Sequence, residues 1–228
     1  MPLSEAEIAR FARQLLLPGF GPVSQEFLRA ARVQVVGAGA IAGPAMVYLA
    51  EAGVGTITVD DAAEVTLGDA AHWLYPPDRE GMPRMVVAIE ALRGVSSFAK
   101  AKVHATGADP TAVLVCPESH TVAREAAERA RASGLSHVVA QGDGDGGIVV
   151  TVPPGAACYA CASPGGAGLP ATPGAAASLG ALAALELLLV LAHAAQDPKG
   201  RRIELVRGIP QTRATQKQPG CACGKPRP

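Results

Sequence analysis

The sequence has no excess of charge of one sign. Its 228 residues include 20 Lys and Arg and 20 Asp and Glu, so the formal net charge at pH 7 is zero. Proteins that bind nucleic acid or anionic membranes through electrostatics present a basic surface. We therefore expect neither nucleic acid nor a membrane among the partners of this chain.

A signal segment and an apolar run of membrane length are also missing. The N-terminus, MPLSEAEIARFARQ, is amphipathic and charged, whereas a secretory signal has a basic segment followed by an apolar one. We therefore expect a cytoplasmic protein. The longest apolar run, 179–191, contains Glu186 and is shorter than the roughly 20 residues that a membrane span needs. It predicts a buried helix packed against a sheet.

The order of patterns along the chain predicts an α/β fold. Short apolar runs alternate with helical patterns, and no internal repeat is visible, which is typical of a doubly wound, mostly parallel sheet in one Rossmann-like domain. The predicted helices are 4–17, with Ser4 and Glu7 as its cap, 25–31, 46–50, 85–92, 121–133 and 179–195. The predicted strands are 33–36, 56–59, 101–105, 112–116, 137–139, 148–152 and 203–206. The segment 142–147 predicts an exposed hairpin turn, 163–177 a flexible loop, and the residues after 206 a polar tail.

The segment 32–61 predicts a nucleotide site. A β-branched strand enters a turn of small residues that contains Gly37 and Gly39, and a helix follows. Glycine permits positive φ and lets a phosphate approach the backbone beside the N–H groups of the new helix. The next strand ends in an acid, Asp61, about 20 residues on, where dinucleotide sites bind a ribose. The third glycine of that fingerprint is Ala42, so a well-packed turn that binds nothing remains an alternative.

The cysteines form two close pairs near the C-terminus. They are Cys158 and Cys161, in CYAC, and Cys221 and Cys223, in CAC. In a cytosolic chain such pairs favour a tetrahedral thiolate zinc site over disulfides. A site of four sulfurs has no open position for a substrate, so its role would be structural, holding the C-terminal tail on the domain. Free thiols in a loose tail are the alternative, and the fifth cysteine, Cys116, lies on a predicted core strand.

Several stretches occur in the same order as in one family. RFARQLLLPGFG, RVQVVGAGAIAG, AGVGTITVDD, GMPR, CYAC and PGCACG together resemble the ThiF/MoeB/HesA adenylyltransferases, the bacterial relatives of ubiquitin-activating enzymes. The resemblance implies an enzyme that uses ATP and magnesium to adenylate the C-terminus of a small ubiquitin-like or sulfur-carrier protein, or of a peptide. It also implies a homodimer, a structural zinc ion, and three parts of a single domain 1–228: a helical arm 1–31, a nucleotide-binding core 32–157, and a zinc-binding, carrier-facing part 158–228.

The resemblance assigns roles to individual residues. Arg13 would reach into the ATP site of the neighbouring subunit, while Arg84 and Glu118 would act beside the phosphates and the magnesium ion of their own chain. The nucleotide would lie against the following residues: Gly37, Gly39, Ala40, Asp61 and His72.

The chain departs from the family pattern at the phosphate site. In the stretch that corresponds to the family's N-x-x-R-Q, Asp69 replaces the asparagine and His72 the arginine. Arg84 replaces the lysine of G-x-P-K, which changes its reach and geometry. Glu118 replaces the metal-binding aspartate, and Ala40 replaces a glycine. The loop after Cys161 contains no cysteine that could form a thioester or persulfide.

These departures leave other hypotheses open. Several changes at one phosphate site predict weak ATP turnover, since the loss of a cationic or metal contact commonly costs one or two orders of magnitude in rate. One alternative is therefore a catalytically inactive homologue that acts as a binding or scaffold subunit. A nucleotide-dependent oxidoreductase with the same glycine turn is a third hypothesis, and the cysteine pairs and the N-terminal arginines argue against it.

Overall fold

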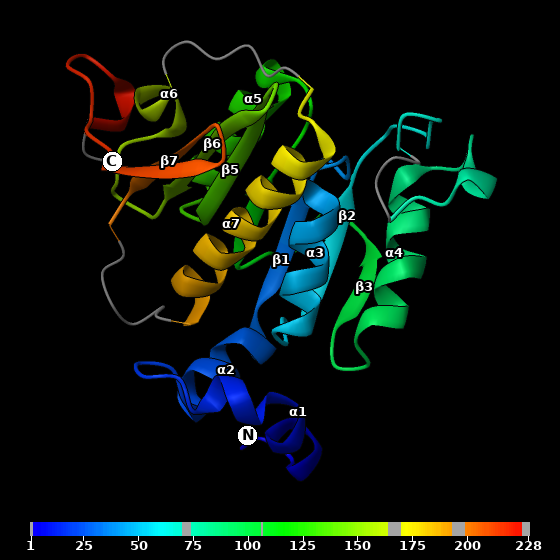
Figure 1. Cartoon of the computed structure of the whole chain (residues 1–228). Coiled ribbons are helices and arrows are strands. Elements are labelled where there is room, and N and C mark those ends of the chain that lie inside the picture. The colour runs from blue at the N-terminus through cyan, green and yellow to red at the C-terminus, as the bar shows by residue number, and fades with distance from the viewer. Residues whose placement is uncertain (1, 70–73, 106, 164–169, 193–198, 225–228) are drawn as a thin grey trace.

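One eight-stranded sheet runs through the molecule, with helices on both faces (Figure 1). The structure is a computed structural model that describes residues 2–69, 74–105, 107–163, 170–192 and 199–224. The strands are β1 (Arg32–Val36), β2 (Thr56–Asp60), β3 (Lys100–Val103), β4 (Ala112–Val115), β5 (Ser136–Asp143), β6 (Gly146–Val152), β7 (Arg201–Val206) and β8 (Ile209–Ala214). The α-helices are α1 (Glu5–Leu15), α2 (Pro22–Ala30), α3 (Ala42–Glu51), α4 (Arg84–Val95), α5 (His120–Ala132), α6 (Tyr159–Ala162) and α7 (Pro173–Ala192). Two short 3-10 helices cover Pro77–Arg79 and Ala222–Gly224.

The strand order determines where a ligand can bind. It is β3-β2-β1-β4-β5-β6-β7-β8, with the first five strands parallel and the last three antiparallel to their neighbours. Strand β2 pairs with one side of β1, and β4 pairs with the other side, so the direction of strand addition reverses between β1 and β4. In open α/β sheets, ligands bind at the carboxyl ends of the strands at such a reversal. The predicted mostly parallel, Rossmann-like sheet is confirmed.

Helices on both faces explain the apolar strands at the centre. In β1, Val33 and Val35 are fully buried, and every residue of β4 is buried. Helices α3, α4 and α7 pack on one face of the sheet and α5 on the other, which gives two apolar clusters separated by the sheet. A strand that is buried on both faces has no polar side, so its sequence is a continuous apolar run.

Helix α7 is long and apolar enough to cross a membrane, by length and composition alone. In the fold it lies across β5 and β6 beside α3, and 61% of its most apolar window is buried (Figure 1). Its one acid, Glu186, is buried and accepts hydrogen bonds at 2.5 Å from both the Thr151 hydroxyl and the Arg201 guanidinium. Helix α7 is therefore a core helix, as the sequence predicts.

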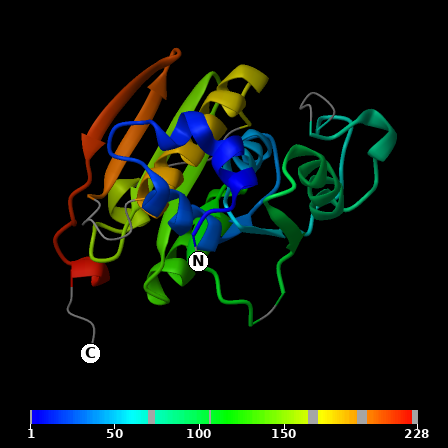
Figure 2. The same cartoon turned by 90° about the horizontal axis from the view of Figure 1, so that it is seen from below.

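The N-terminal helices lie at the amino ends of the strands. Ser4 and Glu7 form the predicted capping box at the start of α1. Helix α2 leads directly into β1, and Leu28 near its end accepts a backbone hydrogen bond from Gly55, at the start of β2. Figure 2 shows both helices in front of the sheet when the molecule is seen from below. They are thus at the opposite end of the sheet from the glycine turn that follows β1.

The hairpin turn expected within 142–147 is present at Gly144-Asp145, and β5 and β6 occupy the rest of that segment as an antiparallel pair. Two other sequence predictions of local structure are wrong. Helix α7 begins at Pro173, inside the predicted loop 163–177. The polar tail contains an additional strand, β8, every residue of which is exposed. Pairing of its backbone with β7 explains why no apolar pattern marks it.

Candidate functional site

The turn after β1 is built so closely that one of its positions, Gly37, requires glycine, while a second, Gly39, faces the side chain of Glu118. Gly37 has a φ of +83°, and a Cβ at this position would lie 2.6 Å from the backbone of Pro117, at the end of β4. A Cβ at Gly39 would meet only a side-chain oxygen of Glu118, at 2.9 Å. The turn therefore brings bare backbone to the reversal point between β1 and β4, which is a cradle suited to phosphate.

Asp61 closes this turn from the neighbouring strand. One of its carboxylate oxygens accepts a hydrogen bond from the backbone N–H of Ala38 at 2.6 Å, and the other accepts one from Ala63 at 2.7 Å. Tyr75 fixes the following peptide of the turn by donating a hydrogen bond from its hydroxyl to the Ala38 carbonyl. Burial raises the pKa of Tyr75, so its hydroxyl stays protonated and remains a donor.

Arg84, the first residue of α4, is buried beside the turn. Its Nε and Nη2 atoms contact the carboxylate of Asp69 at 3.1 and 2.8 Å, and its Nη1 atom contacts Glu118 at 3.0 Å. Burial acts to lower the pKa of Arg84, but the carboxylates of Glu118 and Asp69 outweigh it and the pKa is raised. Arg84 is therefore a permanent cation held between two acids.

The two acids differ in their freedom to move. The Asp69 side chain is 6% exposed, and it also accepts hydrogen bonds from the backbone N–H and the hydroxyl of Thr66. The Glu118 side chain is 68% exposed. An ion pair open to water contributes little to stability, so Glu118 can leave Arg84 at small cost and turn toward a bound cation.

A cavity of about 250 Å³ lies between these residues at the carboxyl ends of β1, β4 and β5. Gln141 of β5 lies at this cavity, and its side-chain N–H donates to the Pro117 carbonyl while its amide oxygen has no partner in the described part of the chain. Sequence reasoning missed Gln141, Tyr75 and Thr66, since none of them belongs to a motif. The residues that line the cavity include Ala40, Ile41, Thr66, Asp69, Arg84, Cys116, Glu118 and Gln141.

Most of the predicted nucleotide residues come together here. Ala40, Arg84 and Glu118 line the cavity; Gly37 and Gly39 do not line it but lie against residues that do, Gly37 against Pro117 and Gly39 against Glu118. Asp61 lies against the same turn through the Ala38 amide. His72 lies outside the described residues. Cys116 is buried, and burial raises the pKa of its thiol to about 12, which fits the predicted inert core residue.

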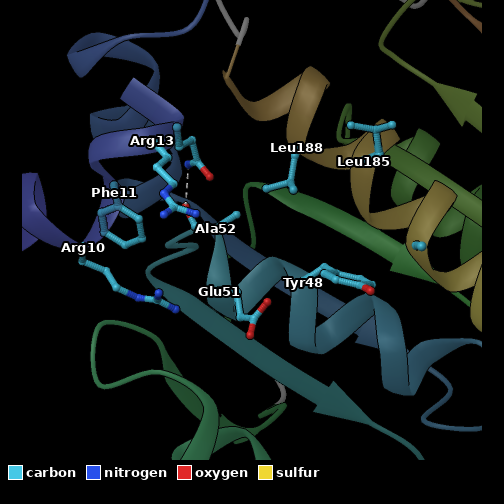
Figure 3. A pocket seen from close by; sticks show the side chains of 10 residues that line it. Arg10, Phe11, Arg13, Tyr48, Glu51, Ala52, Leu185 and Leu188 are labelled. Atoms are coloured by element: carbon cyan, nitrogen blue, oxygen red, sulfur yellow. Dashed lines mark hydrogen bonds between the residues drawn. The ribbon is translucent and has the colours of Figure 1, made fainter. Parts of the chain in front are cut away.

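Arg13 lies elsewhere. It borders a second cavity of about 550 Å³ between α1, α3 and α7, together with Arg10, Tyr48 and Leu185 (Figure 3). This cavity is at the carboxyl end of α3, whereas the glycine turn is at its amino end. A helix of 10 residues is about 15 Å long. Arg13 therefore does not reach the glycine turn of its own chain.

The four paired cysteines form one cluster. The distances between sulfur atoms are 3.7 Å for Cys158 and Cys161, 3.6 Å for Cys158 and Cys221, and 3.6 Å for Cys161 and Cys223. All four sulfurs lie within 4.8 Å of one another. Tetrahedral zinc with Zn–S bonds of about 2.3 Å separates its sulfurs by about 3.8 Å, so the cluster has the dimensions of a four-thiolate metal site.

The surroundings of the cluster also suit a metal. The backbone N–H of Gln218 donates to the Cys161 sulfur at 3.3 Å, which stabilises a thiolate. A hydrogen bond from the Cys223 backbone lowers the pKa of Cys221 to about 7, while burial raises the pKa of Cys158 to about 12. A metal that binds all four sulfurs must displace protons from the buried thiols, so its affinity decreases as the pH falls.

The two glycines of the turn are expected to respond differently to a methyl group. Gly37→Ala forces an alanine into positive φ and against the Pro117 backbone, which we expect to cost roughly 3 kcal/mol of unfolding free energy. Gly39→Ala meets only the mobile Glu118 side chain, and we expect it to cost about 1 kcal/mol or less. Urea unfolding of the two variants checks this, and equal losses would contradict the geometry of the turn.

Fold and site together define a Rossmann-like α/β protein with a glycine turn at the strand reversal and a four-cysteine cluster near the C-terminus. The model of the ThiF family matches residues 11–223, nearly the whole chain. The chain belongs to the ThiF family.

Curated relatives match over shorter segments. The adenylyltransferase and sulfurtransferase uba4 of Pyricularia oryzae is 39% identical over 110 residues, which are 48% of this chain and 22% of that protein. The heterocyst protein HesA of Trichormus variabilis is 37% identical over 95 residues, 41% of this chain and 36% of HesA. The sulfur carrier protein adenylyltransferase of Thermus thermophilus is 33% identical over 105 residues, 46% and 39% of the two chains. The chain thus spans well under half the length of these relatives.

Solved structures share the fold. E. coli MccB with MccA-N7isoASN superposes with a TM-score of 0.79 at 17% identity, covering 98% of this chain and 76% of that one. MccB in complex with N-formylated MccA gives a TM-score of 0.82 at 18% identity, covering 94% and 75%. At such low identity these similarities establish the common fold alone.

Proposed function

We propose that this chain is an ATP-dependent adenylyltransferase that activates the C-terminal carboxylate of a small ubiquitin-like or sulfur-carrier protein, or of a peptide. The observation that carries the proposal is the convergence of the glycine turn, Asp61, Arg84 and Glu118 at one reversal point of the sheet. Relatives named as adenylyltransferases, among them one that acts on a sulfur carrier protein, support the same chemistry.

In the proposed reaction the carboxylate oxygen of the carrier forms a bond to the α-phosphorus of ATP. The bond from that phosphorus to the oxygen that bridges to the β-phosphate breaks, and pyrophosphate leaves with the electron pair. The backbone of Gly37 and Gly39 would hold the phosphates, and Asp61 would bind the ribose hydroxyls with its remaining lone pairs. Arg84 would stabilise negative charge that develops on the phosphates. Glu118 would hold magnesium, which supplies a Lewis acid at the phosphate oxygens when bound.

Two further assignments belong to this proposal. The cysteine cluster would hold a structural zinc ion, supported by its thiolate donors and its dimensions. The chain would act as a homodimer in which Arg13 of one subunit enters the nucleotide site of the other. The separation of Arg13 from its own glycine turn supports this arrangement, as do the exposed apolar side chains of Tyr48 and Leu185 around the Arg13 cavity.

Calorimetric titration with ATP tests the proposal. We expect a binding heat at millimolar ATP with magnesium, and a much smaller heat when magnesium is omitted, because Glu118 and Asp69 leave the site acidic. Exchange of labelled pyrophosphate into ATP in the presence of a candidate carrier then measures turnover. No heat at millimolar ATP with magnesium would refute an ATP-dependent enzyme.

A catalytically inactive binding subunit is the second candidate. One observation favours it: Arg84, which a phosphate would need, is already paired with the buried Asp69. Binding of a carrier without pyrophosphate exchange is the result that this alternative predicts.

A further inference from the structure

The guanidinium of Arg84 has few hydrogen-bond donors left. An arginine has five N–H groups. Nε and Nη2 of Arg84 donate to Asp69, and Nη1 donates to Glu118, so each of its three nitrogens already has a partner. At most two N–H groups remain for any other acceptor. The planar fork that would bind a phosphate through two parallel hydrogen bonds faces Asp69 instead.

The pairing of Asp69 with Arg84 is firm. The two side chains are 6% and 10% exposed; Oδ2 of Asp69 accepts hydrogen bonds from Nε and Nη2 of Arg84, and Oδ1 lies 2.8 Å from Nη2. Two more hydrogen bonds, from the N–H and hydroxyl of Thr66, hold the carboxylate in place at 2.7 and 2.9 Å. Asp69 therefore fixes the orientation of Arg84, whereas the exposed Glu118 does not.

This pair stands directly at the phosphate cradle. A Cβ built on Gly39 would lie 3.7 Å from Nη1 of Arg84 and 2.9 Å from an oxygen of Glu118. A phosphate at Gly39 would therefore meet the one edge of the guanidinium that Asp69 does not hold, and it would displace Glu118 from that edge. The negative charge of Asp69, close behind, opposes the phosphate as well.

We propose that Asp69 is an affinity-determining residue, which keeps Arg84 from engaging the phosphates of ATP with its fork. The inference rests on the proposed function, since it concerns the same nucleotide site. An uncharged residue at this position would release the guanidinium and remove one negative charge. Asp69 thus lowers the affinity for the phosphate chain of ATP without contacting the nucleoside.

The test is Asp69→Asn, which keeps an acceptor for Thr66 and removes the charge. We expect the dissociation constant for ATP with magnesium to fall about tenfold, the change that one additional charge-assisted hydrogen bond produces. The dissociation constant for adenosine should stay within twofold, because adenosine has no phosphate. A general loosening of the fold would weaken the binding of both ligands, so the ratio of the two constants is the informative measurement.

Two controls accompany this variant. Asp78→Asn makes the same change in net charge at a side chain that is 79% exposed, and it should leave the affinity for ATP unchanged. In an Arg84→Gln background, Asp69→Asn should produce less than a threefold change, because there is no guanidinium to release. Such a double-mutant cycle isolates the coupling between the two residues.

The outcomes separate the inference from the proposed function. If the wild type binds ATP with magnesium and Asp69→Asn binds it no more tightly, the role of Asp69 is wrong and the proposed function stands. If neither protein binds ATP, both are wrong. If Asp69→Asn does not fold, Arg84→Lys carries the test, because a lysine has no fork for Asp69 to hold. It should bind ATP at least as tightly as the wild type, and tenfold weaker binding would overturn the inference.

Discussion

Replacing Arg13 by alanine is expected to lower pyrophosphate exchange roughly 100-fold, the loss that follows removal of one cationic contact to a reacting phosphate. The expectation follows from the proposed dimer, in which Arg13 completes the nucleotide site of the neighbouring subunit. Thermal unfolding of the variant should be close to that of the wild type, since Arg13 is exposed on α1. Exchange rates measured at saturating ATP and carrier check the prediction.

Mixing two inactive variants shows in which subunit Arg13 acts. Arg13→Ala retains Glu118, and Glu118→Ala retains Arg13, so a mixed dimer contains one complete site if the arginine crosses the interface. Random reassociation makes half of the dimers mixed, each with one of its two sites complete, and should restore about a quarter of the wild-type rate. Mixtures as inactive as their components would exclude action across the interface.

Arg10→Ala is the matched control. Arg10 lies one turn earlier on α1 and borders the same cavity, so it shares the surroundings and charge of Arg13 (Figure 3). We expect less than a threefold effect on exchange. A loss as large as that of Arg13→Ala would mean that the cavity depends on its total charge and not on one arginine.

Replacing Cys161 by serine is expected to abolish the binding of about one zinc ion per chain and to lower the unfolding free energy on the order of 5 kcal/mol, part of the roughly 10 kcal/mol or more that zinc contributes in isolated zinc-binding peptides. The sulfur of Cys161 contacts those of Cys158 and Cys223 and accepts from Gln218, so its loss opens the centre of the cluster. Metal analysis and chemical unfolding measure the two effects.

Limited proteolysis shows which segment of the chain loses its structure when the metal is absent. Without the metal, the segment after β8 has few other attachments in the described structure, so trypsin should cleave after Lys217 in the variant or in chelator-treated protein. Cys116→Ala is the control, because this buried cysteine packs in the main core cluster and is not one of the four clustered cysteines, so the metal content should be unchanged. A wild type that contains no zinc after purification with metal present would refute the structural zinc site.

The sequence was informative where local chemistry alone determines the structure. The capping box of α1 depends on two residues three positions apart, and both of its hydrogen bonds are present. The glycine turn depends on a backbone conformation that few other residues adopt, and Gly37 has the expected positive φ. The cysteine pairs are close in sequence, so only the distance between the pairs required tertiary structure.

Other features depend on contacts between distant segments. In the hairpin of β5 and β6, Gly147 has a φ of +146°, and a Cβ there would meet both the backbone carbonyl of Gln141 and the side chain of Leu179 from α7. The strand β8 is held by backbone pairing with β7 and has no buried side chain. Sequence spacing indicates neither contact.

In the candidate site, too, motifs predicted some residues, whereas contacts between distant residues became visible only in the structure. Motif positions predicted Gly37, Arg84 and Glu118 as neighbours of a phosphate, which stays a prediction, and the last two line one cavity. The sequence showed only that Asp69 replaces an asparagine of the family pattern and did not indicate where its side chain would point. The structure places its carboxylate on Arg84, a contact across 15 positions that no residue pattern indicates.

The two outer strands of the sheet determine how copies of this protein can meet. An unpaired edge strand invites another sheet to add to it, and proteins prevent this with charged residues and proline. The edge strand β3 carries Lys100 and Lys102, and the opposite edge strand β8 carries Pro210 and Arg213. Both edge strands therefore disfavour the addition of a strand from another copy of the chain. We expect a second subunit to pack on the helices instead.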